Sequence, residues 1–270
     1  MRLLREGASI EYAVGGSGPA VLFLHAFPLG QVMWDAQADF LEPRFRVIRF
    51  DDRGFGGSSV GDGPLTMDQI ADDAVAVLDH LGVASATVVG CSMGGYAAFA
   101  MLRRHARRVR ALVLANTRAG ADTDEARGNR ATLAQKVLEQ GSAAAADAFL
   151  PKLLGATTHR ERAGLVERLH AVILANPPRG VANALLGLGA RADSRPTLAE
   201  VTVPTLVISG TEDTLTPPPE AEALERGIRG SRLERIERAG HLANLENPEA
   251  FNAALGAFLD GLHSPHSNAR

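Results

Sequence analysis

Several classes of protein require features that this chain lacks. Its 270 residues include one cysteine, Cys91, so an internal disulfide cannot form and a reducing compartment is suitable. No apolar run approaches the roughly 18 residues that a membrane span needs. The first residues, MRLLREGASIEYAVGGSG, lack the apolar segment and cleavage pattern of a signal peptide. We therefore expect a soluble cytoplasmic protein that does not bind a membrane.

An excess of basic residues is also missing. The 28 Lys and Arg stand against 31 Asp and Glu, which gives a formal net charge of -3. Proteins that bind nucleic acid present a basic stripe that neutralises phosphates. The sequence has no such stripe, so nucleic acid is not an expected partner.

What the chain does contain is an alternation of short apolar runs and longer helical patterns. Apolar residues make up 46% of the sequence, and a length of 270 residues suits one large domain or one domain with an insertion. Continuous apolar runs indicate strands that are buried on both faces. The expected strands are Ile10–Val14, Ala20–Phe27, Arg46–Asp52, Ala86–Gly90, Arg110–Asn116, Pro204–Gly210 and Ser231–Glu237. Strands that alternate with helices predict an α/β fold, with helices on both faces of a mostly parallel sheet.

Helical patterns fill the gaps between these strands. Thr66 and Gln69 are spaced as in a capping box ahead of the run IADDAVAVLDHLG, and Gly82 is a suitable helix stop. The run SMGGYAAFAMLRRHA has helical apolar spacing, and a last amphipathic helix is expected over Asn247–Leu259.

One long segment breaks the alternation. Between Thr117 and Val201 the sequence has only helical patterns, of which Leu165–Pro178 is the clearest. We expect residues 1–117 and 201–262 to form the core, 118–200 to form a helical cap inserted into it, and 263–270 to be a disordered tail. Ligand sites of α/β folds lie at the carboxyl edge of the sheet, so we expect the cap to cover that edge.

A glycine-flanked serine lies between an expected strand and an expected helix, in the stretch VVGCSMGGY. Gly90, Ser92 and Gly94 fit the pattern G-x-S-x-G, which joins a strand to a helix through a sharp turn. Such a turn brings the backbone at the two glycine positions close together, so a side chain there would clash. Ser92 is then forced outward in a strained conformation. Cys91 is a rival nucleophile, but its own neighbours at those positions are Val89 and Met93, so we expect it to be a packing residue.

A serine hydroxyl is a weak nucleophile and needs a base to remove its proton. In folds with this turn the chain order is Ser, then Asp or Glu, then His. His241 lies in a loop between the last strand and the last helix and is the expected base. The other downstream histidines are in the expected insertion or in the tail: His159, His170, His263 and His266.

The acid that orients the base should follow a strand near the carboxyl edge. Asp213 follows the strand that ends at Gly210, and the adjacent Glu212 is its competitor. A second possible position follows the strand that ends at Asn116, but the first carboxylate there is Asp122. This leaves Asp213 as the expected acid.

Two backbone N–H groups are expected to stabilise the oxyanion that forms during attack. One belongs to Met93, at the start of the helix after Ser92. The other belongs to Phe27, in the loop after the first buried parallel strand, where we expect His25 to have a structural role. This chemistry requires no metal and no organic cofactor.

These motifs resemble those of the α/β-hydrolase superfamily over nearly the whole chain, from about Glu11 to Leu259. The resemblance rests on LHAFP, DDRGFGGS, GCSMGG, GTED and AGHLANLENPEAF. It implies an eight-stranded type of sheet with a helical cap and a serine hydrolase that acts through an acyl-enzyme. It also favours Asp213 as the acid, because G-x-x-D at this place matches the family. Ala26 departs from the usual His-Gly pair of the oxyanion loop.

Within the superfamily, FPLGQVMWDAQ and ANPPRGVANALLGLGARADSRPTL look like the 3-oxoadipate enol-lactonase group and its carboxylesterase relatives. Enol-lactonases commonly carry a tryptophan in the cap. Here Trp34 precedes the cap, and Phe149 is the aromatic residue within it. We therefore expect a carboxylesterase acting on small esters, with a lactonase as the alternative.

Further alternatives share the fold. A perhydrolase or haloperoxidase-like enzyme uses the same triad, often with a tryptophan where this chain has Phe27. A dehalogenase or an epoxide hydrolase would need an aspartate in place of Ser92. The alternatives that are not enzymes are a small-molecule receptor and an interaction scaffold.

The expected cap is rich in arginine. Such scattered residues usually belong to solvated helix faces, although one of them could bind a substrate carboxylate through two hydrogen bonds. They include Arg118, Arg127, Arg130, Arg160, Arg162 and Arg179.

Overall fold

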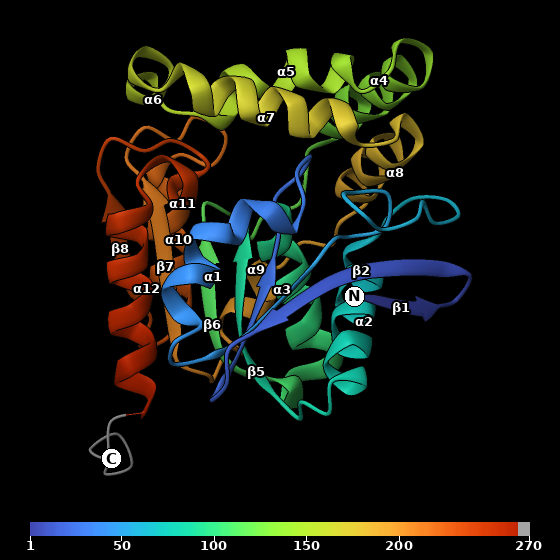
Figure 1. The fold of residues 1–270 in the computed structure, drawn as a ribbon. Coiled ribbons are helices and arrows are strands. Elements are labelled where there is room, and N and C mark those ends of the chain that lie inside the picture. The colour runs from blue at the N-terminus through green and yellow to red at the C-terminus, as the bar shows by residue number, and fades with distance from the viewer. Residues whose placement is uncertain (264–270) are drawn as a thin grey trace.

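The structure, a computed structural model, describes residues 1–263 of the chain. The expected tail of 263–270 lies outside the described residues except for His263, which ends the last helix. Within residues 1–263, eight strands form one sheet in the order β1-β2-β4-β3-β5-β6-β7-β8 (Figure 1). They are β1 (Arg2–Arg5), β2 (Ala8–Gly15), β3 (Ala20–Leu24), β4 (Arg46–Phe50), β5 (Ala86–Cys91), β6 (Val109–Ala115), β7 (Thr205–Gly210) and β8 (Arg232–Ile236).

The sheet is mostly parallel. Strands β1, β2 and β4 pair antiparallel, and every later pairing from β4 to β8 is parallel. Seven strands lie where the sequence predicts them. The eighth, β1, has the sequence RLLR and alternates between exposed and half-buried residues, so it has no apolar run to reveal it. The predicted strand Ala20–Phe27 is shorter in the structure, because the chain leaves β3 after Leu24 and turns at Ala26 and Leu29.

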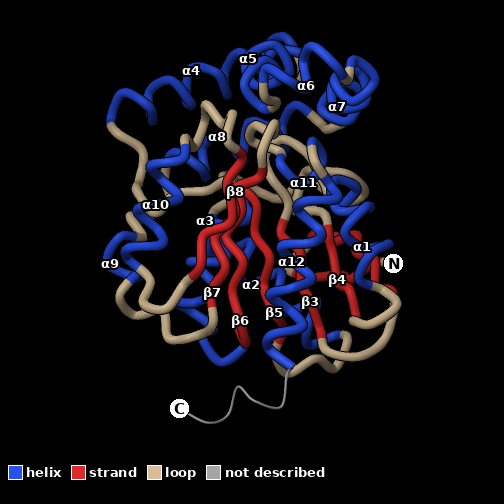
Figure 2. Tube along the Cα trace, turned by 90° about the vertical axis from the view of Figure 1, so that its left-hand side faces the viewer, coloured by secondary structure: helices blue, strands red, loops and turns tan. Residues whose placement is uncertain are grey.

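Helices cover both faces of the sheet. Helices α1 and α12 pack together on one face, while α3 and α10 lie on the other (Figure 2). Helix α2 packs on α3. The core helices are α1 (Asp35–Leu41), α2 (Met67–His80), α3 (Met93–His105), α10 (Pro218–Gly227), α11 (Ala243–Glu246) and α12 (Pro248–His263), with short 3₁₀ turns at Gln31–Trp34 and Ala106–Arg108.

The predicted limits of α2 are confirmed. The hydroxyl of Thr66 accepts a hydrogen bond from the backbone N–H of Gln69 at 3.1 Å, as expected for a helix cap. At the other end, Gly82 has a φ of 66°, a conformation that glycine adopts without a steric penalty.

Between β6 and β7 the chain is helical throughout, as predicted. The helices are α4 (Asp124–Gln140), α5 (Ala143–Leu153), α6 (Ala156–Glu161), α7 (Ala163–Ala175), α8 (Pro178–Gly189) and α9 (Arg195–Leu198). Helices α4 to α7 lie across the top of the core in Figure 1, with α8 beneath them at one side. Helix α9 instead lies beside α10 on the flank of the sheet (Figure 2). Helix α7 ends before the proline pair, and Pro178 opens α8, where its missing N–H is tolerated.

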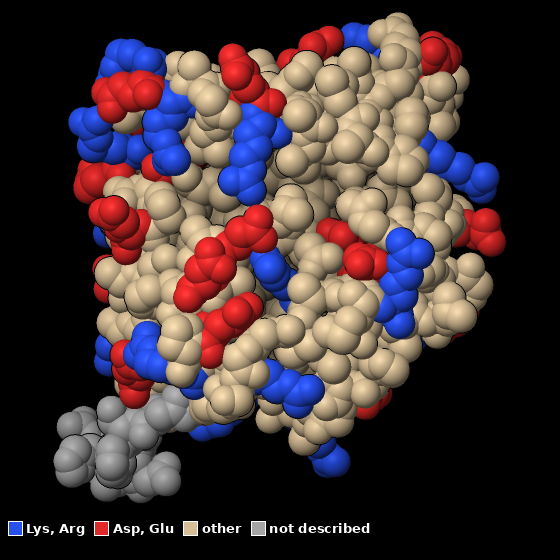
Figure 3. Space-filling model, in the orientation of Figure 1, with Lys and Arg blue, Asp and Glu red and all other residues tan. Residues whose placement is uncertain are grey.

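Charged side chains of both signs lie on the face of the molecule that Figure 3 shows. On the face shown in Figure 3, Lys and Arg lie among Asp and Glu and do not gather into a patch of one sign. No helix within residues 1–263 is long and apolar enough to cross a membrane.

Candidate active site

Ser92 lies at a strained turn between β5 and α3. Its φ of 51° and ψ of -110° are rarely adopted by a residue with a side chain. The positions on either side of the turn have to be glycine, because a Cβ atom there would clash with neighbouring backbone. A Cβ on Gly90 would lie 2.3 Å from the carbonyl oxygen of Gly94, and a Cβ on Gly94 would lie 2.2 Å from that of Leu24. The turn therefore has the geometry that the sequence predicts, with the serine directed away from the sheet.

Asp213 and His241 come together although they follow different strands. Nδ1 of His241 lies 2.9 Å from Oδ2 of Asp213, and both residues are almost fully buried. An ionised carboxylate can only accept, so Nδ1 carries a hydrogen and donates a hydrogen bond to Asp213. The other ring nitrogen, Nε2, is the atom left to accept a proton when the imidazole acts as a base.

The carboxylate of Asp213 is held by several further donors. Oδ2 also accepts from the Thr216 hydroxyl at 2.7 Å and from Nδ2 of Asn116 at 2.9 Å. Oδ1 accepts from the backbone N–H groups of Leu215 and Thr216 at 2.8 and 3.0 Å. Burial by itself would raise the pKa of Asp213, but the charge of His241 and these hydrogen bonds outweigh it and lower the pKa to about 2.

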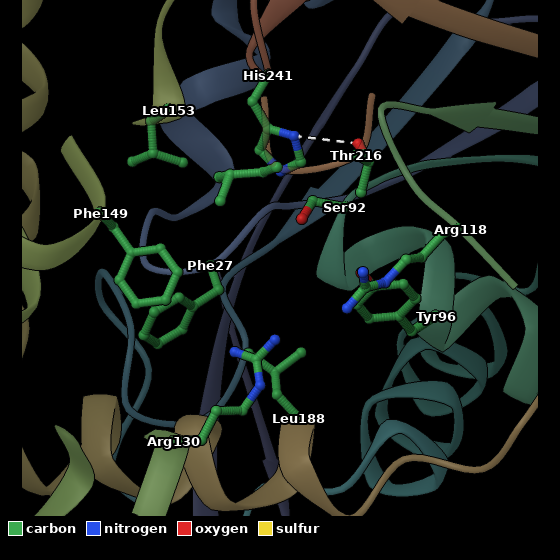
Figure 4. Close-up of a pocket in the computed structure, with 11 residues that line it drawn as sticks. Phe27, Ser92, Tyr96, Arg118, Arg130, Phe149, Leu153, Leu188, Thr216 and His241 are labelled. Carbon is green, nitrogen blue, oxygen red and sulfur yellow. Dashed lines mark hydrogen bonds between the residues drawn. The ribbon is translucent and has the colours of Figure 1, made fainter. Parts of the chain in front are cut away.

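Ser92 lies beside His241 in one pocket, which both side chains line (Figure 4). Among residues 1–263, no hydrogen bond joins Oγ of Ser92 to the imidazole. The structure thus brings Asp213 and His241 into direct contact and places Ser92 alongside them.

The two expected oxyanion donors belong to the loop after β3 and to the first turn of α3. Within the described part of the chain, the backbone nitrogens of Phe27 and Met93 have no hydrogen-bond partner. The loop that carries Phe27 is fixed from below by His25, whose Nδ1 contacts the carbonyl of Ala26 at 3.0 Å. Nε2 of His25 accepts from the N–H of Asp52 at 3.0 Å. His25 lies outside the pocket lining, which agrees with a structural role.

The rival residues point elsewhere. Glu212 accepts hydrogen bonds from the backbone and hydroxyl of Thr157 at 2.8 and 2.5 Å, so its carboxylate faces the helices above the sheet and not His241. Cys91 is buried, and burial raises the pKa of its thiol, which removes the thiolate that a nucleophile needs.

The pocket above Ser92 is small, with a free volume of about 100 Å³. One wall is aromatic, because the rings of Phe27 and Phe149 meet edge to face at 5.1 Å. The lining residues are Phe27, Ser92, Tyr96, Arg118, Arg130, Phe149, Leu153, Leu188, Leu215, Thr216 and His241.

Sequence reasoning missed Tyr96, although it lies one helical turn after Ser92. Leu153 and Leu188 carry no sequence signal, because nothing local tells which face of a long helical insertion is turned inward.

The segment that carries His241 is tied to the helices above it. Oε1 of Glu246 accepts from the backbone N–H groups of Gly240 at 2.9 Å and Leu242 at 3.1 Å, on either side of His241. Its Oε2 accepts from the N–H of Gly155, at the start of α6, at 2.7 Å. Sequence reasoning did not single out Glu246, because these contacts join distant parts of the chain.

Three glycines pack backbone to backbone at the same place. A Cβ on Gly240 would lie 2.2 Å from the nitrogen of Gly155, and a Cβ on Gly210 would lie 2.1 Å from the carbonyl oxygen of Gly240. The end of β7, the His241 segment and the start of α6 are therefore in direct contact. Within residues 1–263, no group of three or more His, Cys, Asp or Glu side chains is placed to hold a metal ion.

Comparisons with known proteins match this architecture. A family model described as alpha/beta hydrolase fold matches residues 19–248. The chain is similar to 3-oxoadipate enol-lactonase 2 of Acinetobacter baylyi, with 32% identity over 259 residues that cover 95% of each chain.

Solved structures of similar proteins agree with these matches. A thermophilic esterase from Thermogutta terrifontis, with malate bound, is 38% identical with a TM-score of 0.95, and the match covers 98% of this chain and 100% of that one. The enol-lactonase from Burkholderia xenovorans is 31% identical with a TM-score of 0.89, and the match covers 96% and 100%. The fold and the family resemblance predicted from the sequence are confirmed.

Proposed function

Because the chain belongs to the α/β-hydrolase family, we propose that it is a serine hydrolase that cleaves small carboxylic esters through an acyl-enzyme. In this proposal Ser92 is the nucleophile, His241 is the general base and Asp213 orients the base. The observation that carries it is the 2.9 Å contact between His241 and Asp213, together with the pocket that His241 and Ser92 both line.

The first half-reaction forms the acyl-enzyme. Ser92 Oγ attacks the ester carbonyl while Nε2 of His241 takes the hydroxyl proton. The ionised Asp213 stabilises the imidazolium that results, and its low pKa keeps it ionised at neutral pH. The backbone N–H groups of Phe27 and Met93 stabilise the tetrahedral oxyanion. His241 then protonates the leaving alkoxide.

The second half-reaction repeats these steps with water. His241 removes a proton from a water molecule that attacks the acyl carbonyl, and the proton then returns to Ser92 Oγ. In this proposal residues 118–200 form the cap. Its Phe149, Leu153 and Leu188 close the pocket from above and favour short, partly apolar substrates.

Lactone hydrolysis is the second candidate, and the similarity to enol-lactonases supports it. A lactone is a cyclic ester, so the same residues take the same roles. The difference is that the leaving alkoxide stays attached to the acyl group and has to be released from the pocket with it.

The test is hydrolysis of p-nitrophenyl esters of rising chain length, together with several lactones. We expect Ser92→Ala to abolish turnover and Asp213→Asn to lower it on the order of 10⁴-fold. Ser59→Ala, which changes a serine outside the pocket, is the matched control and should keep full activity. We also expect a fluorophosphonate to label Ser92.

Two results would contradict the proposal. Near-normal turnover by Ser92→Ala would exclude Ser92 as the nucleophile. Tight ligand binding without turnover or labelling would instead favour a receptor. Peroxide-dependent bromination in acetate buffer would indicate a perhydrolase-like activity of the same site.

A further inference from the structure

A buried carboxylate that is not itself part of the pocket lining holds two of the arginines that are. Asp122 has a fully buried side chain. Its Oδ1 accepts from Nη2 of Arg118 at 3.0 Å, and its Oδ2 accepts from Nε of Arg130 at 2.5 Å. Arg118 lies in the segment after β6, and Arg130 lies on α4. Two separate segments therefore place a guanidinium group in the lining of the same pocket.

A third arginine completes the cluster. Nη2 of Arg191 lies 2.8 Å from Oδ1 of Asp122, and its guanidinium carbon lies 4.4 Å from the centre of the Tyr96 ring. Its other contacts are to the carbonyls of Leu188 and Gly120. One negative charge therefore faces three positive charges, and no carboxylate is among the described residues that line the pocket.

The two lining arginines keep donors that no protein group uses. Among the described residues, Nε and Nη1 of Arg118 and both Nη atoms of Arg130 have no hydrogen-bond partner, and Nε of Arg118 is buried. Both guanidinium groups are turned toward the interior of the pocket in Figure 4. Their side chains are 28% and 19% exposed, against 51% for Arg127 on the same helix α4 and 67% for Arg179. Arg118 and Arg130 are thus not part of a solvated helix face.

We propose that Arg118 and Arg130 form a carboxylate subsite, and that the substrate is a short ester or lactone that carries a free carboxylate. This inference rests on the proposed function, since it places the carboxylate in the same pocket as Ser92. A guanidinium group matches a carboxylate with two parallel hydrogen bonds, which fixes orientation as well as charge. The small volume sets the length, because the carboxylate and the reacting carbonyl have to fit together.

Two esters of the same shape test the subsite. Monomethyl succinate carries a carboxylate where methyl 4-methylpentanoate carries an isopropyl group, and both can be followed in a pH-stat. We expect kcat/KM of the wild type to favour the charged ester at least tenfold. Arg130→Met and Arg118→Met should each lower this ratio at least tenfold, because a hydrogen-bonded charge pair is lost. Arg127→Met is the matched control on α4 and should leave the ratio unchanged.

The proposed subsite would be overturned if the wild type hydrolysed the two esters with nearly equal kcat/KM. It would also be overturned if neither Met variant changed the ratio of the two kcat/KM values. If the wild type hydrolyses neither ester and Ser92 is not labelled, the proposed function fails and the subsite is judged by binding alone. Succinate binding by calorimetry, lost in Arg130→Met and kept in Arg127→Met, would then support it. Absence of succinate binding to the wild type would reject it. Circular dichroism checks that each variant is folded.

Discussion

Asn116, the residue after β6, donates a hydrogen bond of 2.9 Å from Nδ2 to Oδ2 of Asp213, which follows β7. The same amide nitrogen donates to the carbonyl of Gly240 at 3.1 Å, next to His241. Asn116 therefore connects Asp213 to the segment that carries His241. On the sequence alone, the end of this strand is a second possible position for the acid. In the structure, this position holds the amide of Asn116, which donates a hydrogen bond to Asp213.

We predict that Asn116→Asp lowers kcat for ester hydrolysis at least tenfold at pH 7. The variant replaces a donor with a second carboxylate next to Asp213, and two adjacent carboxylates resist being ionised together. Asp213 then loses a hydrogen bond, and the pKa of the pair rises. Steady-state kinetics measure the effect. Asn183→Asp, which changes an amide bonded to the carbonyl of Gly61, is the control, and an equal loss in both variants would contradict the prediction.

The carboxylate of Glu246 accepts hydrogen bonds from backbone N–H groups on both sides of His241 and from the N–H of Gly155 at the start of α6. We predict that Glu246→Gln lowers the free energy of unfolding by about 1–3 kcal/mol. The amide has one acceptor oxygen, and its NH₂ group would face a backbone N–H that Glu246 now satisfies. We also expect a lower kcat with little change in KM, since the His241 segment loosens while the pocket lining is kept.

Urea unfolding and steady-state kinetics test this pair of effects. Glu249→Gln, on α12, is the matched control and should change neither quantity. A loss of stability without a fall in kcat would limit Glu246 to a structural role.

Asp52 is a buried acid below the oxyanion loop, and neither of its carboxylate oxygens accepts a hydrogen bond among the described residues. Burial raises the pKa of Asp52 to about 6, an effect that His25 only partly opposes. In the unfolded chain the pKa of an Asp is about 3.9. The folded state therefore binds the proton more tightly, and the free energy of unfolding falls as the pH rises from about 4 to above 6.

We predict that Asp52→Asn removes this pH dependence. Relative to the wild type, the variant should gain about 2 kcal/mol in unfolding free energy between pH 4.5 and pH 7.5. Urea unfolding at the two pH values measures the gain. Asp62→Asn changes a fully exposed acid and should follow the wild type. A gain of the same size in both variants would refute the assignment to Asp52.

Cys91 should be inert in the native protein. It is 1% exposed, and burial raises the pKa of its thiol. We predict that a thiol reagent such as iodoacetamide neither modifies Cys91 nor lowers ester hydrolysis, whereas the protein in urea reacts with one equivalent. Rapid labelling of Cys91 in the native protein would contradict this prediction.

Much of the fold could be predicted because its signals are local. The buried strands β3, β5 and β7 are continuous apolar runs, and the turn at Ser92 needs two glycines at fixed spacing. The order Ser, Asp, His then limits the choice of residues. Strand β1 was missed because an edge strand of four residues with arginine at both ends lacks such a run.

The contacts around the site could not be predicted, because they join segments far apart in the chain. Glu246 meets Gly155 across 91 residues, and Arg191 meets Asp122 across the whole of α4 to α8. The sequence indicates that the insertion is rich in arginine. It does not indicate that Arg118 and Arg130 face inward while Arg127 faces solvent, because that depends on how the helices are turned.

The contact of Gly155 with Gly240 means that the insertion is not a module that can be exchanged freely. A chimera that received this region from a relative would need glycine where β7, the His241 segment and α6 meet. Any larger residue at position 155 would collide with Glu212 or with the backbone next to the imidazole. Pocket residues on α4, α5 and α8, such as Arg130, Phe149 and Leu188, are not part of this glycine contact, so they can be exchanged without forcing the His241 backbone to move.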